Sequence, residues 1–112
     1  MAKLVLSTGG TIVYQCFLER ARVIVGREAN NQIVVDDPAV SRAHAAITAV
    51  GNDYILEDLG SANGTMVNGT PVQRRILQHG DVITLGMFHL RYVDSKASSD
   101  IDLERTMLIG GL

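Results

Sequence analysis

The sequence predicts an all-β protein, built as an antiparallel β-sandwich of two sheets. Its apolar runs are short, rich in Val and Ile, and bounded by Gly, Asn and Asp, which is the pattern of many short strands. Residues 1–94 show no helical periodicity of apolar residues. This many short strands do not fit in one flat sheet, and their apolar faces must be buried against a second layer. A sandwich is therefore the expected architecture, and a barrel is the alternative.

Each expected strand is a run of β-branched, aromatic or alternating residues that ends at a turn-forming residue. In chain order these runs are Lys3–Ser7, Thr11–Leu18, Arg22–Val25, Ile33–Val35, Ala45–Val50, Tyr54–Asp58, Met66–Val67, Thr70–Val72, Asp81–Leu85 and Phe88–Val93.

The connections have the chemistry of tight turns. Residues that tolerate a positive φ separate the runs at Gly51-Asn52-Asp53, Asn68-Gly69, Gly80-Asp81 and Leu85-Gly86. Asn68-Gly69 is the strongest of these signals, because an Asn-Gly pair between two short strands is typical of a two-residue hairpin.

Length and charge limit the function classes. A chain of 112 residues fits one domain with a single core. The net charge of −2 gives no basic footprint, so nucleic acid is not an expected partner. The apolar run at the N-terminus is too short for a signal peptide or a membrane span, and we therefore expect a cytoplasmic protein without a membrane partner.

The single cysteine and the C-terminal residues complete this outline. Cys16 is alone, which excludes an internal disulfide and a zinc site of several cysteines, and its neighbours Phe17 and Leu18 indicate a buried thiol. Small polar residues follow Tyr92-Val93. The sequence therefore predicts a domain over residues 3–93 and a flexible linker and tail over 94–112.

Polar residues gather at three predicted turns. Arg27 follows Gly26 at the end of a strand, where its planar guanidinium is suited to an anion such as phosphate. Ser41 and Arg42 follow a loop that Pro38 stiffens, and the Ser41 hydroxyl and amide are candidate donors to the same anion. Asn63 lies in a later tight loop, where its amide can donate to and accept from a peptide backbone.

His44 lies three residues after Ser41, a spacing that raises the question of catalysis. A nucleophile and base also need an orienting carboxylate and an oxyanion hole, and no motif supplies them. We expect His44 to lie half-buried and to hold the loop of Ser41 through hydrogen bonds to backbone. No cofactor, metal site or enzymatic activity is expected.

In this order, the motifs resemble those of the forkhead-associated domain family over about residues 3 to 93. The matching segments are Val25-Gly26-Arg27, Val40-Ser41-Arg42-Ala43-His44-Ala45, Tyr54-Ile55-Leu56-Glu57-Asp58-Leu59-Gly60-Ser61-Ala62-Asn63-Gly64-Thr65-Met66-Val67-Asn68-Gly69, Leu77 and Gly80-Asp81-Val82-Ile83-Thr84-Leu85-Gly86.

The resemblance implies a sandwich of about eleven strands whose loops at one end bind phosphothreonine in an extended peptide. It assigns the phosphate to Arg27 and Ser41 with help from Arg42, and the peptide backbone to Asn63. It assigns loop support to Gly26, His44, Gly64 and Asn68. Ala62 departs from the pattern, because many members carry Thr or another polar residue there.

The tail contains a candidate ligand for such a site. Thr106 is followed three residues later by Ile109, a branched apolar type that some forkhead-associated domains prefer at that position. The hypothesis is that a Ser/Thr kinase phosphorylates Thr106 and that the tail then binds its own domain or a neighbouring molecule. A docking segment for another protein and an uninvolved tail are the alternatives.

The leading hypothesis is therefore an adaptor for phosphothreonine proteins in Ser/Thr kinase signalling. A scaffold that binds a partner without phosphate is the second function class, and Ala62 favours it. A small hydrolase built on Ser41 and His44 is the third. An organiser of a larger assembly, such as a secretion apparatus, is compatible with either binding class.

Overall fold

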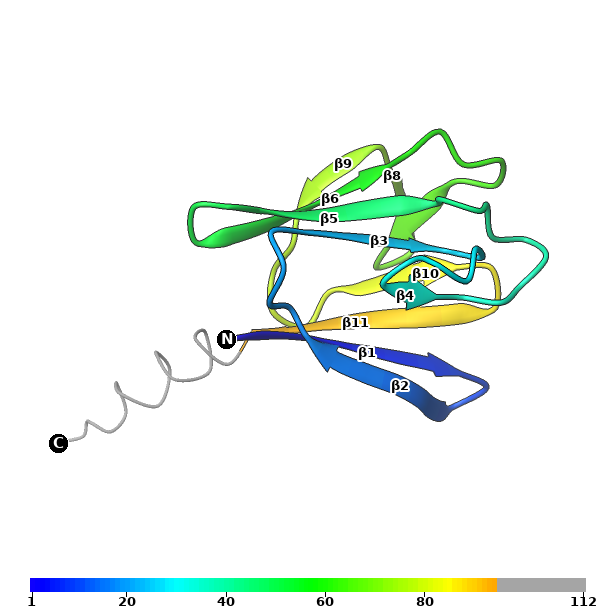
Figure 1. The fold of residues 1–112 in the computed structure, drawn as a ribbon, viewed down its shortest axis with the longest axis horizontal. Coiled ribbons are helices and arrows are strands. Elements are labelled where there is room, and N and C mark those ends of the chain that lie inside the picture. Colours follow the sequence, from blue (N-terminus) through cyan, green and yellow to red (C-terminus); the bar gives the residue numbers. More distant parts are fainter. Residues whose placement is uncertain (95–112) are drawn as a thin grey trace, which may run out of the picture.

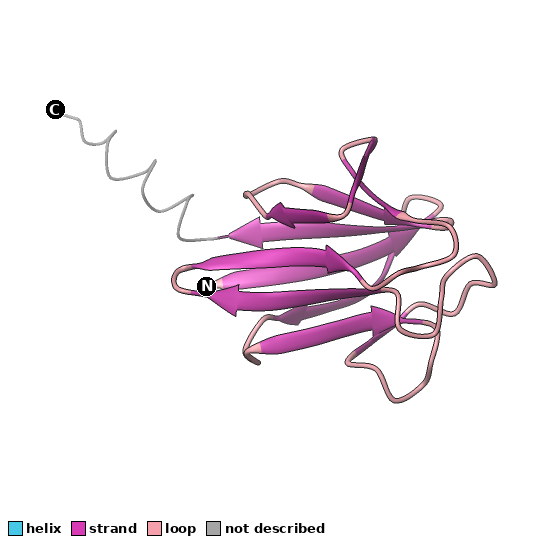
Figure 2. Cartoon of the chain, turned by 90° about the horizontal axis from the view of Figure 1, so that it is seen from above, coloured by secondary structure: helices cyan, strands magenta, loops and turns pink. Residues whose placement is uncertain are grey.

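The structure, a computed structural model, describes residues 1–94 and contains two packed β-sheets (Figures 1 and 2). The strands are β1 (Ala2–Thr8), β2 (Thr11–Phe17), β3 (Arg22–Gly26), β4 (Ile33–Val34), β5 (Ala45–Val50), β6 (Asp53–Asp58), β7 (Thr65–Val67), β8 (Thr70–Val72), β9 (Arg74–Ile76), β10 (Val82–Leu85) and β11 (Phe88–Asp94). The predicted linker from residue 95 onward, Thr106 and Ile109 lie outside the described residues.

The sandwich is confirmed and the barrel is not formed. One sheet has six strands in the order β2-β1-β11-β10-β7-β8, and the other has five in the order β4-β3-β5-β6-β9. The first and last strands pair along their full length, with Ala2 opposite Asp94 and Thr8 opposite Phe88. The part of the chain that the structure describes contains no helix long and apolar enough to cross a membrane.

The core lies between the sheets and is aliphatic. Alternate residues of β1 and β11 point into it, as the period-2 pattern requires. Tyr92 packs edge to face against Tyr54 with 6.2 Å between ring centroids. The fully buried large hydrophobic side chains are Leu4, Ile33, Ile47, Leu56, Ile83, Leu85, Leu90 and Tyr92, joined by several buried valines.

The structure contains one strand that the sequence did not predict, and one of its strand pairs is parallel where an antiparallel pair was expected. Strand β9 pairs with β6 although it is short and carries two adjacent arginines, Arg74 and Arg75. Strand β4 pairs with β3 in parallel, and the Gln32 side chain accepts a hydrogen bond from the Ile24 amide at 2.8 Å beside this pair. The remaining strands agree with the predicted runs to within one residue at each end.

Cys16 is less buried than predicted. It is half-buried on β2, an edge strand of the six-stranded sheet, and packs against the core from there. Burial raises the pKa of the Cys16 thiol. The neighbouring Phe17 is exposed. Leu18, the other neighbour that suggested burial, is buried just beyond the end of β2, but Cys16 lies on the edge strand itself and is only partly covered, which is why the prediction was wrong.

The Asn68-Gly69 hairpin forms as predicted. Asn68 has a φ of 53° and Gly69 a φ of 83°, and Val67 pairs with Thr70 across this two-residue turn. The Asn68 side chain also accepts from the Val82 amide at 3.0 Å and donates to Asp81 at 2.9 Å. The residue therefore joins the β7–β8 hairpin to the start of β10.

Asp81 is a buried carboxylate that holds several of these segments together. It receives two hydrogen bonds from the Arg75 guanidinium, both at 3.1 Å, and one from the Gln78 amide at 2.8 Å. Burial alone would raise its pKa, but the hydrogen bonds from Arg75, Gln78 and Asn68 outweigh this effect and lower the pKa of the carboxyl. Asp81 also stabilises β9, because its carboxylate holds the guanidinium of Arg75 in that strand.

We expect Asp81→Asn to destabilise the domain by roughly 1–3 kcal/mol at pH 7, because charge-assisted bonds to a buried carboxylate are lost. Since folding lowers the Asp81 pKa, its contribution is present above the unfolded value of about 3.9 and is lost as the pH falls through the folded value. Urea unfolding followed by circular dichroism at pH 7 and about pH 3 measures both effects.

The control for this experiment is Asp36→Asn, which removes an exposed carboxylate. The difference in stability between wild type and Asp81→Asn should shrink at the lower pH. Equal stability of the wild type and Asp81→Asn at pH 7 would contradict the role of Asp81.

Candidate functional site

Three loops meet at one end of the sandwich, the end opposite the N-terminus (Figure 1). They follow β3, connect β4 to β5, and connect β6 to β7. Hydrogen bonds tie the three loops to one another, as the contacts below show. The four predicted ligand residues Arg27, Ser41, Arg42 and Asn63 are therefore brought to the same end.

Arg27 is anchored by its backbone and by one nitrogen of its side chain. Its amide donates to the Ser41 carbonyl at 3.0 Å, and Nε donates to the Val40 carbonyl at 2.9 Å. Arg27 is exposed and forms no ion pair with any carboxylate in residues 1–94. The Nε contact fixes the orientation of the guanidinium and leaves its two terminal nitrogens as donors.

Gly26 permits the close approach of the two loops. A Cβ at this position would overlap the carbonyl oxygen of Arg42 and lie 2.9 Å from the Asn31 side-chain nitrogen. That same carbonyl accepts hydrogen bonds from the Asn31 side chain at 2.6 Å and from the Glu28 amide at 3.3 Å. Glycine is required at position 26 because there is no room for a Cβ atom.

Ser41 offers its hydroxyl to a ligand, but its amide is already used. The Ser41 amide donates to His44 Nδ1 at 3.1 Å, so the expectation that this amide serves an anion is wrong. The hydroxyl oxygen accepts from the Ala62 amide at 3.1 Å. The hydroxyl proton of Ser41 has no acceptor among residues 1–94 and remains available to a ligand.

His44 is more deeply buried than predicted, with no exposed surface. Nδ1 accepts from the Ser41 amide, so Nε2 carries the proton of a neutral ring and donates to the Gly64 carbonyl at 2.8 Å. The predicted support of the Ser41 loop is therefore seen. Both ring nitrogens are engaged with backbone groups, and neither is directed to the Ser41 hydroxyl as a general base would be.

Asn63 and Gly64 complete the third loop. The Asn63 side-chain nitrogen donates to the Ala39 carbonyl at 2.8 Å and thereby ties this loop to that of Ser41. Gly64 has a φ of 83°, a conformation that favours glycine. The Asn63 side chain is exposed and keeps its carbonyl oxygen and one N–H for a ligand.

Asp58 is the supporting residue that the sequence interpretation missed. Its carboxylate accepts from the Ser61 and Thr65 hydroxyls at 2.6 and 2.7 Å, and from the Gly60 and Ser61 amides at 3.0 Å each. Burial raises its pKa, but these hydrogen bonds outweigh that effect and lower the pKa of the carboxyl. An Asp at the end of a strand, with Gly-Ser beginning two residues later, is the signal that could have revealed it.

The remaining two predicted residues have different surroundings. Arg42 is exposed, and its guanidinium has no protein partner within the described range, so it is free to approach an anion. Asn68 lies at the far end of β7 from Gly64 and supports the turn before β10, as described above. Asn68 therefore does not belong to the loop cluster, although it shapes a turn.

The loop cluster presents two guanidinium groups without a carboxylate partner in residues 1–94, one hydroxyl and one side-chain amide; hydrogen bonds to neighbouring loops orient all of these groups except the Arg42 guanidinium. Such donors match the oxygens of a phosphate, and the amide matches a peptide backbone. Residues 1–94 contain no group of three or more His, Cys, Asp or Glu side chains that could hold a metal ion.

Two relatives align with most of this chain. Glycogen accumulation regulator GarA of Mycolicibacterium smegmatis is 34% identical over 99 residues, which cover 88% of this chain and 63% of GarA. Oxoglutarate dehydrogenase inhibitor of Corynebacterium jeikeium is 36% identical over 93 residues, which cover 83% of this chain and 65% of that protein. The chain thus spans a little under two thirds of the length of these relatives.

Solved structures agree with these relatives. An FHA domain studied for its phosphothreonine-dependent interactions superposes with a TM-score of 0.76 at 36% identity, covering 83% of this chain and 95% of that one. The FhaA FHA domain, complexed with the intracellular domain of Rv3910, gives a TM-score of 0.75 at 37% identity and covers 82% and 99%. The FHA domain family model matches residues 23–86. The chain therefore belongs to the forkhead-associated (FHA) domain family.

Proposed function

We propose that this chain is a non-catalytic adaptor that binds phosphothreonine peptides and acts with a Ser/Thr kinase in the cytoplasm. The observation that carries the proposal is the exposed Arg27 guanidinium, which is oriented by Val40 and has no carboxylate partner in residues 1–94. An exposed cation in a fixed orientation is suited to an incoming phosphate. The proposed domain covers residues 3–93.

In this proposal Arg27, Ser41 and Arg42 hold the phosphate, and Asn63 holds the peptide backbone. A phosphate brings nearly two negative charges and three strong acceptors to an otherwise weak ligand. Each charge-assisted hydrogen bond contributes roughly 1.5–3 kcal/mol. Phosphorylation thereby decides whether the peptide binds.

A hollow beside Asn63 supplies room for the peptide side chains near the phosphothreonine. It measures about 290 Å³ and is lined partly by Met66, Pro71 and Thr84. The two relatives described above are named as a regulator and an inhibitor, and one of the similar structures concerns phosphothreonine-dependent interactions. These likenesses support the proposed role in regulation through phosphothreonine.

Ala62 favours a second candidate function, a scaffold that binds its partner without phosphate. Its side chain has no polar atom, and its amide already donates to the Ser41 hydroxyl. No donor remains at this position for a phosphate. A partner that binds equally to the wild type and to Arg27→Ala would support the scaffold and contradict the adaptor.

We expect Arg27→Ala to weaken binding to a phosphothreonine peptide library by about 100-fold or more, since about two charge-assisted bonds are lost. Fluorescence anisotropy measures this change, with unphosphorylated peptides as the baseline. Arg22→Ala is the matched control, because Arg22 lies at the other end of β3 and its guanidinium contacts Thr48. Retention of phosphate-dependent binding by Arg27→Ala would refute the proposed site.

The tail hypothesis rests on this proposed function and adds a specific ligand. We expect a Leu103–Leu112 peptide to bind only when Thr106 carries phosphate, and Arg27→Ala to abolish that binding. Isothermal titration of both peptide forms, beside the phosphothreonine library, gives the answer. Binding of the library without binding of the phosphorylated tail would reject tail recognition and leave the adaptor intact.

A further inference from the structure

Strand β2 is an open edge of the six-stranded sheet. It pairs with β1 on one side, and no strand within residues 1–94 pairs with its other side. The Leu18 amide donates to the Ala2 carbonyl at 2.8 Å, so alternation directs the backbone groups of Cys16 and Tyr14 toward β1. The N–H and C=O groups of Gln15 and Phe17 therefore point outward.

The other three sheet edges of the described chain are protected against pairing. Strand β4 has two residues, and β8 and β9 have three each. Pro71 lies in the middle of β8, and Arg74 and Arg75 lie in β9. Short length, proline and charge are the usual means of blunting an edge. Strand β2 is seven residues long and contains neither a charged residue nor a proline.

Four of the seven side chains of β2 are apolar and exposed. The exposed fractions are 60% for Ile12, 51% for Val13, 47% for Tyr14 and 53% for Phe17. Single exposed apolar residues are ordinary on a protein surface, but these four leave an uncharged edge strand with exposed apolar side chains on both of its faces. Such an edge is suited to a further strand.

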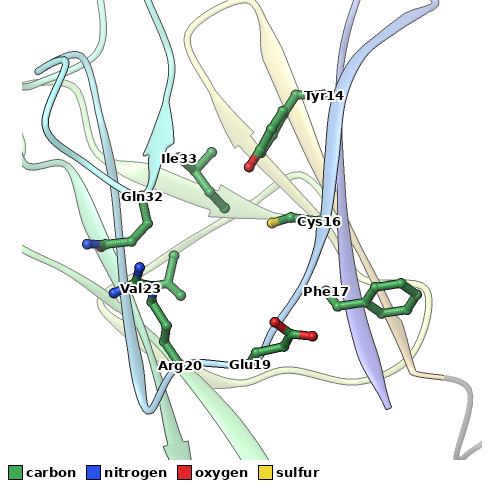
Figure 3. A pocket seen from close by; sticks show the side chains of 8 residues that line it. All are labelled: Tyr14, Cys16, Phe17, Glu19, Arg20, Val23, Gln32 and Ile33. Carbon is green, nitrogen blue, oxygen red and sulfur yellow. The ribbon is translucent and has the colours of Figure 1, made fainter.

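A groove lined by apolar residues together with Glu19, Arg20 and Gln32 runs beside this edge, on the side that faces the second sheet. Figure 3 shows Tyr14 and Cys16 directed across the gap toward Ile33 and Val23, while Phe17 points away. This cleft measures about 210 Å³. An adjoining hollow of about 420 Å³ is also lined by Tyr14, together with Val13, Val34 and Phe88.

We propose that two copies of this chain form a dimer by antiparallel pairing of β2 with β2, with the two-fold axis at Gln15. The outward backbone groups of Gln15 then bond to those of Gln15 of the partner subunit, and the two side-chain amides are self-complementary. Tyr14 lies opposite Cys16 of the partner subunit on the groove side. The two six-stranded sheets become one continuous sheet.

The occupant is a second copy because β2 is complementary to itself. In two-fold antiparallel pairing each residue near the axis meets the same or a neighbouring residue, so a charged strand would oppose like charges. No such repulsion arises in β2. The pairing also uses the open edge of each copy, so the assembly closes at two subunits.

Sedimentation velocity of the full chain tests this dimer. We expect the apparent mass to rise toward twice the monomer mass between ~10 and ~500 µM, a range suited to a small interface. Gln15 is exposed, so Gln15→Lys and Gln15→Glu leave the fold intact but place like charges on the axis. Each variant should be monomeric alone, and an equimolar mixture of the two should dimerise again.

Cysteine cross-linking locates the axis. Opposed Cα atoms of a hydrogen-bonded pair lie about 5.5 Å apart, within the range of a disulfide. In a Cys16→Ser background, Gln15→Cys should form a covalent dimer under mild oxidation, whereas Thr70→Cys, an exposed site on the edge strand β8, should not.

The dimer is independent of phosphate, so Arg27→Ala should dimerise like the wild type. This separates β2 pairing from recognition of a phosphorylated tail. A wild-type chain that remains monomeric at the highest concentration overturns the proposal. So does a dimer that Gln15→Lys leaves unchanged, or a Gln15→Cys protein that cross-links no better than Thr70→Cys.

Discussion

The arrangement of the three loops depends on one buried imidazole, that of His44. A ring without solvent contact must satisfy both nitrogens inside the protein, and His44 does so with the Ser41 amide and the Gly64 carbonyl. The loops before β5 and before β7 are therefore held at a fixed separation. Any change that turns the ring leaves a donor and an acceptor buried without partners, which costs more than either bond contributes.

The groups that support the loops and the groups available to a ligand are separated by burial. His44 and Asp58 are buried and spend their polar atoms on other protein groups. Arg27 and Arg42 are exposed, and their terminal guanidinium nitrogens contact no carboxylate of the described residues. Because Val40 orients Arg27 and Ala39 orients Asn63, these two donors need little ordering when the anion arrives, so more of their interaction energy appears as affinity.

The sequence was sufficient for features that depend on local chemistry, and insufficient for those that depend on tertiary contacts. The Asn68-Gly69 turn and the alternating strands follow from local preferences, and the positions of Arg27, Ser41 and Asn63 follow from their motifs. Strand β9 could not be recognised, because it forms by pairing with β6, some twenty residues earlier in the chain. The hydrogen bond from the Ser41 amide to His44 could not be predicted either. The sequence places the histidine near Ser41, but it does not give the orientation of the ring.

The proposed dimer has a consequence for how its two sites would work. The loop cluster lies at the end of the sandwich where β2 begins, and antiparallel pairing reverses the second β2. The two loop clusters therefore face opposite ends of the joined sheet. One short peptide with two phosphothreonines cannot reach both clusters, so it gains nothing from multivalency. Such a dimer is instead suited to joining two separate phosphorylated proteins, because each cluster remains open and no contact at β2 blocks it.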